Sequence, residues 1–305
     1  MTKTVSIVGS SDLAGTIAFA IMQYDLCKNI VLIDHYNGSL PIFTDIDDCS
    51  FMNDTNIILG DWKTAGSADV IIFAYDSNST FPPEEKDISV TKFLKASKLA
   101  VEKMKPFFTP ETILMVANYP SDIFTKFIYY WSELPASKVF GIGTMLDTMR
   151  LKRLLAEDYE VPETSIPLFV YGVERENTLV TWLNPPNESG KPAFKSLNVN
   201  AAHLFAMRKG HEFDRNLQTK EPFFAVSAIV VTLLKTVLNN ETRLCTVTFY
   251  QPEFDVTISY PILLTGKGVT KYTGFFLDDN ERITMDREIV KIKASIAKYK
   301  LLMEA

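Results

Sequence analysis

Four short apolar runs in the first half of the chain alternate with segments of helical pattern. The runs are VSIVG (5–9), NIVLID (29–34), ADVIIFAY (68–75) and TILMVAN (112–118). Helix-compatible segments at 14–24 and 90–104 lie between them. Continuous apolar strands separated by helices are typical of a parallel sheet that is covered on both faces. Because the connections between such strands are right-handed crossovers, we expect a doubly wound α/β fold.

The pattern changes after about residue 143, so we divide the chain into domains at 1–143 and 144–305. In the second part, PLFVYG and TLVTW predict an antiparallel hairpin, and 222–238 predicts a buried helix. The runs LCTVTFY and VTISYPILL predict two further strands. The last segment carries apolar residues on one helical face, at Ile289, Ile292, Ile296, Tyr299 and Met303. The second part is therefore expected to be an α+β domain that ends in an amphipathic helix.

Composition excludes several classes of partner. The chain has a net charge of −6 and no basic run, so neither nucleic acid nor an anionic membrane is expected to bind. Three scattered cysteines predict neither a disulfide framework nor a metal site, which fits a reducing cytoplasm. The start, MTKTVSIVG, does not have the pattern of a signal peptide. The most apolar segment, 223–234, is too short to cross a bilayer.

The turn after the first apolar run, GSSDLA, has part of the pattern that binds a dinucleotide. Gly9 permits the tight turn, and Ala14 is small enough for the helix to pack on the strand. Asp34 ends the second run, where an acid accepts hydrogen bonds from the adenosine ribose. Ser11, however, stands at the second glycine position, where its side chain would crowd the phosphates. The turn predicts either an NAD site or a βαβ unit whose turn only caps a helix.

Longer stretches resemble the L-lactate/malate dehydrogenase family over nearly the whole chain. They are VSIVG…NIVLID, ADVIIFA, PLFVYG…TLVTW and ISYPILLTGKGV. In the most specific stretch, 117–155, VANYPSD and GTMLDTMR are similar to the family's NP-V-D turn and its G-[ST]-x-L-D-[ST]-x-R motif. The resemblance implies a Rossmann-like NAD(P)-binding domain at 1–143 and the family's C-terminal substrate domain at 144–305. It also implies NAD as cofactor, a 2-oxo or 2-hydroxy acid as substrate, and a homo-oligomer.

The resemblance assigns roles to individual residues. Asp147 matches the acid that orients the catalytic histidine, and Arg150 matches the arginine that holds the substrate carboxylate by a two-pronged salt bridge. Ala74 and Tyr119 fall at cofactor positions. Tyr119 replaces the asparagine that contacts nicotinamide and substrate, and it is large enough to fill the space of the ring. Asp147 and Arg150 have two interpretations: they keep only the architecture of the family's site, or they keep its chemistry as well.

Two motifs depart from the family. Its mobile loop, G-E-x-R, is replaced by DSNSTFPPEEKDI, in which Lys86 is the only cation, and a lysine lacks the planar fork of arginine. At the hairpin tip the family reads G-E-H-G-D and this chain reads GVERE, so Glu174 stands where the catalytic histidine is expected. None of the three histidines falls at a matching position. A glutamate is ordinarily an anion at neutral pH and cannot donate the proton.

Two interpretations of function follow. In the first, the chain is an NAD-dependent 2-hydroxy acid oxidoreductase with altered acid–base chemistry at Glu174. In the second, which we favour, it is a catalytically inactive homologue that serves as a nucleotide- or protein-binding scaffold. It is then similar to the lactate-dehydrogenase-like domains of ubiquitin-conjugating enzyme variant proteins, which also lack the histidine. No metal is expected in either case.

Overall fold

The structure is a computed structural model, and the part of the chain that it describes has several gaps. The described residues are 3–9, 12–33, 40–52, 54–75, 86–174, 179–182, 204, 222–272, 277 and 279–304.

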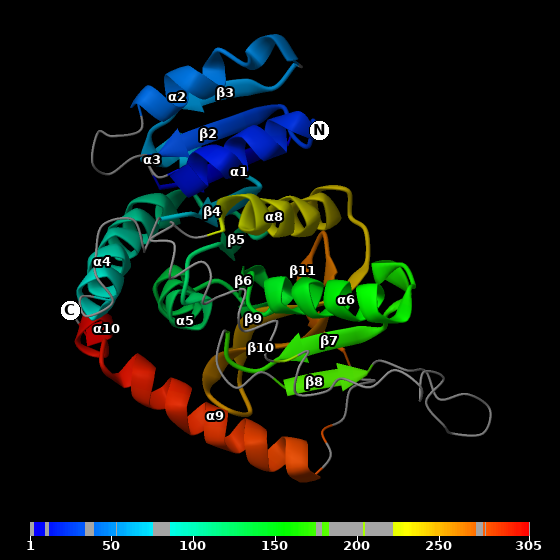
Figure 1. The fold of residues 1–305 in the computed structure, drawn as a ribbon. Helices are drawn as coiled ribbons and strands as arrows, with labels where there is room; N and C mark the ends of the chain where they lie inside the picture. The colour runs from blue at the N-terminus through cyan, green and yellow to red at the C-terminus, as the bar shows by residue number, and fades with distance from the viewer. Residues whose placement is uncertain are drawn as a thin grey trace.

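A parallel sheet forms the first half of the molecule (Figure 1). Its strands are β1 (Thr4–Val8), β2 (Asn29–Ile33), β3 (Asn56–Leu59), β4 (Val70–Phe73), β5 (Ile113–Val116) and β6 (Val139–Gly141). They lie in the order β3-β2-β1-β4-β5-β6, with all neighbours parallel. This is the strand order of a doubly wound dinucleotide-binding fold, so the predicted α/β class is confirmed. The sequence interpretation had not included β3 and β6.

Three antiparallel strands extend the same sheet beyond β6. They are β9 (Arg243–Gln251), β10 (Val256–Thr265) and β11 (Gly268–Lys271). The junction is the pairing of β6 with β9, in which Phe140 lies opposite Phe249. The sheet therefore continues across residue 143, and its nine strands in the described part of the chain are drawn from both halves of the sequence.

The predicted hairpin is confirmed as a separate two-stranded sheet of β7 (Leu168–Tyr171) and β8 (Leu179–Trp182). It is joined to the large sheet by a bridge between Gly172 and Ser259, whose backbone groups exchange two hydrogen bonds of 2.9 and 3.1 Å. The hairpin tip is therefore held against β10. The polar stretch 184–200 lies outside the described residues.

Helices cover the sheet on both faces. They are α1 (Asp12–Gln23), α2 (Leu40–Asp47), α3 (Trp62–Gly66), α4 (Lys86–Met104), α5 (Ser121–Ser132), α6 (Met145–Tyr159), α8 (Phe223–Leu238), α9 (Asp279–Ala297) and α10 (Leu301–Glu304). Short 3₁₀ helices occupy Ser50–Met52, Lys105–Phe107, Ala136–Lys138 and Glu163–Ser165. Helix α1 packs against α8, and α4 packs against α5 on the other side of the central strands (Figure 1). Helix α8 is the buried helix expected at 222–238, and no described helix is long and apolar enough to span a membrane.

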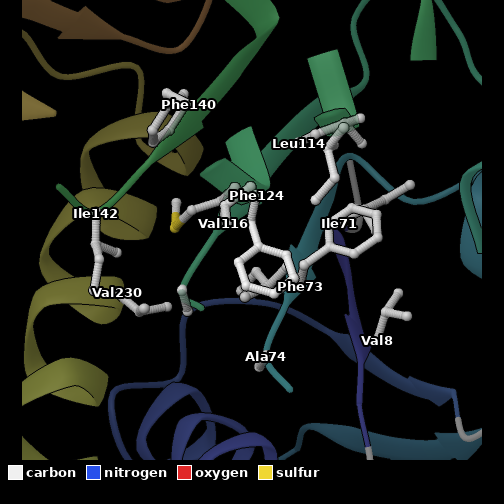
Figure 2. Packing of buried hydrophobic residues seen from close by; sticks show 14 of the residues in the cluster. Val8, Ile71, Phe73, Ala74, Leu114, Val116, Phe124, Phe140, Ile142 and Val230 are labelled. Atoms are coloured by element: carbon white, nitrogen blue, oxygen red, sulfur yellow. The ribbon is translucent and has the colours of Figure 1, made fainter. Parts of the chain in front are cut away.

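The core lies around β4 and β5, whose residues are all buried because helices cover both faces. Figure 2 shows Phe73 and Val116 of these strands with Phe124 of α5 and Val230 of α8 around them. Burying one such side chain contributes roughly 1.5–3 kcal/mol relative to leaving it exposed. Because one core is shared by helices from both halves of the chain, the two halves stabilise each other.

The final segment is helical, but it is not one continuous helix. Helix α9 ends at Ala297, and α10 begins only at Leu301. The predicted apolar face does turn inward, since Ile289, Ile292 and Tyr299 are buried. Helix α9 contacts β8, β10 and α5, and α10 contacts α5 (Figure 1). The C-terminal segment therefore packs against the side of the molecule that contains α5.

Candidate functional site

The carboxyl ends of β1, β4 and β5 meet at one edge of the sheet, which is where doubly wound folds bind dinucleotides. Gly9 follows β1 with a φ of +146°, and its N–H donates to the Ile33 carbonyl oxygen at 3.1 Å. A Cβ at this position would collide with the Ala74 carbonyl oxygen, just after β4. Gly9 is therefore required by the packing of the strand ends themselves. Ala14 is buried on α1, as close packing of helix and strand demands.

An aromatic side chain that the sequence interpretation had overlooked lies at this edge. Tyr75 follows Ala74, is only 3% exposed, and stacks on Phe93 of α4 with ring centroids 5.5 Å apart. Its carbonyl oxygen accepts a hydrogen bond from Asn118 Nδ2 at 2.5 Å. The available sequence signal was a large aromatic residue directly after an apolar strand. The edge of the sheet is thus closely packed after β4.

Several of the proposed site residues cannot be placed. Ser11, Asp34 and the replaced loop at 76–85 lie outside the described residues. Lys86 begins α4, but its side chain is likewise outside them. The roles proposed for Ser11 and Asp34 in nucleotide binding, and for the loop and Lys86 in substrate binding, therefore stay as predictions.

Glu174 lies at the hairpin tip and is buried, with 5% of its surface exposed. Its Oε2 accepts a hydrogen bond from the backbone N–H of Ser121 at 2.9 Å. Ser121 is the first residue of α5, whose N-cap residue, Pro120, makes no capping bond through its side chain. The first N–H groups of a helix have no partner within the helix, and a negative group there is favoured by the helix dipole. Glu174 therefore acts as the N-terminal cap of α5.

Asp122 returns a bond to the hairpin tip and connects it to the large sheet. Its Oδ2 accepts from the backbone N–H of Glu174 at 3.0 Å, and its Oδ1 accepts from the Thr248 hydroxyl at 2.8 Å. The Thr257 hydroxyl donates to its carbonyl oxygen at 2.5 Å. Every one of these groups is buried, so the bonds offset the cost of removing a carboxylate from water. The signal in the sequence was an acid in the first turn of a helix.

The same cluster reaches the start of α6 through Ser259. Its hydroxyl lies 2.7 Å from the Thr248 hydroxyl and accepts from the backbone N–H of Thr144 at 3.1 Å. Gly143, with a φ of +52°, leaves the space for this contact, because a Cβ there would collide with the Ser259 hydroxyl. We name Ser121, Asp122, Glu174, Thr248 and Ser259 the polar cluster. It joins α5, the hairpin tip, β9 and β10.

Asp147 and Arg150 both lie on α6. Asp147 is buried in the first turn, and Arg150 is half-buried one turn later. Helix α6 is fixed to the hairpin by Thr148, whose hydroxyl accepts from the Val170 backbone N–H at 3.0 Å. The motif residues therefore keep a regular helical spacing on a well-anchored helix.

A cavity of about 200 Å³ lies beside the polar cluster. Tyr119 and Glu174 both line it, so the structure brings together two of the residues that the family motifs had singled out. Asp147 and Arg150 are not among the described residues that line it. Another wall comes from Lys291 of α9 and from Lys298 and Tyr299, which directly follow that helix. The sequence interpretation had not connected α9 with the site.

Metal and thiol chemistry find no support among the described residues. No group of three or more His, Cys, Asp or Glu side chains there could hold a metal ion. The three cysteines are free, and burial raises the pKa of the Cys27 and Cys245 thiols to about 12. Because the thiolate is the reactive form, these two buried thiols are inert near neutral pH.

Comparison with known proteins identifies relatives along nearly the whole chain. The L-lactate dehydrogenase of Geobacillus thermodenitrificans is 26% identical over 318 aligned residues, covering 96% of each chain. L-lactate dehydrogenase A of Rhizopus oryzae is 25% identical, covering 95% of this chain and 91% of its own. No protein-family model matches the chain.

Solved structures agree with these relatives on the fold. The L-lactate dehydrogenase of Clostridium thermocellum superposes with a TM-score of 0.81 at 23% identity, covering 98% of this chain and 99% of its own. The minor L-lactate dehydrogenase of Enterococcus mundtii superposes with a TM-score of 0.83 at 21% identity, covering 97% and 98%. The homologues of this chain are thus L-lactate dehydrogenases at low sequence identity, and its fold is theirs.

Proposed function

We propose that this protein is a lactate-dehydrogenase homologue that has lost the usual proton transfer and serves as a binding scaffold. The observation that carries the proposal is the hydrogen bond from the Ser121 N–H to Glu174 Oε2. An ionised carboxylate accepts hydrogen bonds and has no proton to donate, and the end of a helix favours that ionised form. The residue at the expected histidine position therefore has a structural use, as the cap of α5, that does not depend on proton transfer.

The described residues fit only the central part of NAD. Gly9 and Ala14 meet the steric needs of a dinucleotide turn, so the pyrophosphate would bind near the start of α1. The proposal leaves no place for the nicotinamide ring beside Glu174, because the large side chain of Tyr119 lines the cavity there. We accordingly derive no hydride-transfer step and propose nucleotide binding without redox chemistry.

A protein partner or a second copy of the chain is part of the proposal. Large apolar side chains are exposed at Phe51, beside α2, and at Phe224 on α8, and α1 contacts both of these helices. A protein interface at either position would remove an exposed aromatic ring from water. The likeness to the dehydrogenase-like domains of ubiquitin-conjugating enzyme variants also belongs to the proposal, since it depends on the missing histidine. A cytoplasmic location is likewise part of the proposal.

The alternative is an active 2-hydroxy acid oxidoreductase with altered acid–base chemistry. The observation that favours it is the retained pair on α6, with Asp147 buried and Arg150 one turn away. Arginine at this position would hold a substrate carboxylate by two parallel hydrogen bonds. Loss of general acid–base help alone lowers a rate by about two to four orders of magnitude, so residual turnover would be slow.

Calorimetric titration with NADH, combined with a turnover assay, tests the proposal. We expect NADH to bind and no NADH oxidation to occur with pyruvate, oxaloacetate or other 2-oxo acids. The matched control is Arg150→Ala, which should leave the NADH affinity unchanged. Turnover above background in the unmodified chain that disappears in Arg150→Ala would show that the alternative is correct. Absence of NADH binding would restrict the scaffold to a protein partner.

A further inference from the structure

The cavity beside the polar cluster has an uneven distribution of charge. Its buried wall carries the carboxylate of Glu174, which the Ser121 N–H holds in position. Its outer wall carries the ammonium groups of Lys291 and Lys298, both exposed at the end of α9. A ligand in this cavity would therefore meet a negative group inside and positive groups at the mouth.

Apolar side chains line the space between these charges. Val173 lies next to Glu174 at the hairpin tip, and Ile292 lies one residue after Lys291 on α9. Ile123 comes from the first turn of α5. All three are buried. These side chains offer a small aliphatic group an apolar contact, beside polar lining that includes Asp122 and Ser295.

The size of the cavity limits the ligand. A dry cavity of about 150 Å³ is large enough to bind benzene. The cavity here, at about 200 Å³, takes a molecule somewhat larger than that and smaller than a nucleotide. A small amino acid fits this limit.

The lysines at the mouth are supported by the structure of α9. Lys291 Nζ lies 2.7 Å from Oε1 of Glu288, which is buried one turn earlier on the same helix. Lys298 follows the end of α9 directly, next to the buried Tyr299. The end of α9 also contacts the α5 side of the molecule, where α10 packs (Figure 1). Lys291 thus lies on a packed helix, and Lys298 lies in the short turn that follows it.

We propose that this cavity binds a small aliphatic α-amino acid as a zwitterion. The ammonium group meets Glu174, the carboxylate meets Lys298 at the mouth, and the side chain packs against Val173 and Ile292. This inference rests on the proposed function and specifies its ligand. A 2-oxo acid would instead bring a carbonyl oxygen next to the Glu174 carboxylate, so that two acceptors would face each other without a proton between them.

Calorimetry with four matched compounds tests the inference: L-valine, L-valinamide, N-acetyl-L-valine and 3-methyl-2-oxobutanoate. Valinamide lacks the carboxylate, acetylvaline lacks the charged amine, and the 2-oxo acid carries oxygen in place of the amine. We expect L-valine to bind and each of the others to bind at least about tenfold more weakly, as the loss of one charge-assisted hydrogen bond predicts.

Three variants locate the binding. Glu174→Gln keeps an oxygen that can accept from the Ser121 N–H, so α5 stays capped while the negative charge is lost. It should weaken the binding of L-valine about tenfold, and Lys298→Met should weaken it by the same factor. The control, Lys293→Met, changes an exposed lysine of α9 that does not line the cavity, and should leave the affinity within about twofold.

The inference is overturned if L-valine gives no heat with folded protein, or if valinamide or the 2-oxo acid binds as tightly. Equal affinities of Lys298→Met and Lys293→Met would also overturn it. Failure of the proposed function would be recognised separately, by oxidation of NADH with a 2-oxo acid in the same preparation. Absence of both NADH oxidation and L-valine binding would thus refute the proposed ligand and leave the proposed function standing.

Discussion

Glu174 and Ser121 are 53 positions apart in the chain, yet one hydrogen bond between them determines the role of the glutamate. The sequence places Glu174 at a strand end beside Arg175 and Glu176, which alone is equally typical of a solvated turn and of an altered catalytic site. The structure buries its carboxylate at the start of α5. At the scale of the residue, this hydrogen bond gives the Glu174 carboxylate a structural role as the cap of α5.

Removing this cap should destabilise the protein measurably. We expect Glu174→Ala to lower the free energy of unfolding by about 2 kcal/mol, since it deletes a helix cap and leaves a buried N–H without that acceptor. Glu174→Gln should cost less than about 1 kcal/mol, because an amide oxygen can still accept. Urea unfolding monitored by circular dichroism measures both. Glu102→Ala on the exposed side of α4 is the control, and equal losses in all three variants would contradict the capping role.

At the scale of the element, the polar cluster joins parts that regular secondary structure leaves separate. The hairpin of β7 and β8 shares no continuous ladder with the large sheet, and only the bridge at Gly172 connects their backbones among the described residues. Thr248 of β9 adds side-chain contacts, to Asp122 at 2.8 Å and to Ser259 at 2.7 Å. Because these hydroxyls and the carboxylate are buried, each depends on the others for its hydrogen bonds.

Thr248→Val tests the cluster with little change of shape. We expect the free energy of unfolding to fall by about 2 kcal/mol, since the Asp122 carboxylate loses a buried donor. The same substitution at Thr270, which is exposed on β11, should change the stability by less than about 0.5 kcal/mol. Denaturant titration compares the two variants. A Thr248→Val protein as stable as Thr270→Val would show that the cluster contributes nothing net.

At the scale of the whole molecule, two sequence regions share one sheet and one core. Strand β9 covers the edge of β6, and α8 packs against α1, although both covering elements lie in the second half of the chain. The proposed boundary at 143 therefore does not divide the chain into two parts whose surfaces are complete alone. An exposed strand edge and an uncovered apolar helix face both favour aggregation.

A fragment of residues 1–143 should reveal this dependence. We expect it to aggregate or to unfold without a cooperative transition, whereas the full chain unfolds cooperatively. Size-exclusion chromatography and thermal melts of both proteins provide the comparison. A monomeric fragment with a sharp melting transition would contradict the expectation and would make 143 a folding boundary as well.

The sequence by itself determined the α/β class, the central strands, the hairpin and the buried helix α8. These follow from the spacing of apolar residues within a few positions, which depends on local geometry and on the burial of one or two faces. It also directed attention to Glu174 and Tyr119, which the structure places around one cavity.

Only the tertiary structure decided what these residues contact. The cap of α5, the bonds of Asp122 to β9 and β10, and the cavity shared by Glu174, Lys291 and Lys298 bring together positions from 52 to more than 120 residues apart. No local pattern encodes such pairs. The spacing of neighbouring residues reports local geometry and burial, and it does not specify which distant residue packs against a given side chain. The resemblance directed attention to Glu174, and long-range packing gave that residue its partners.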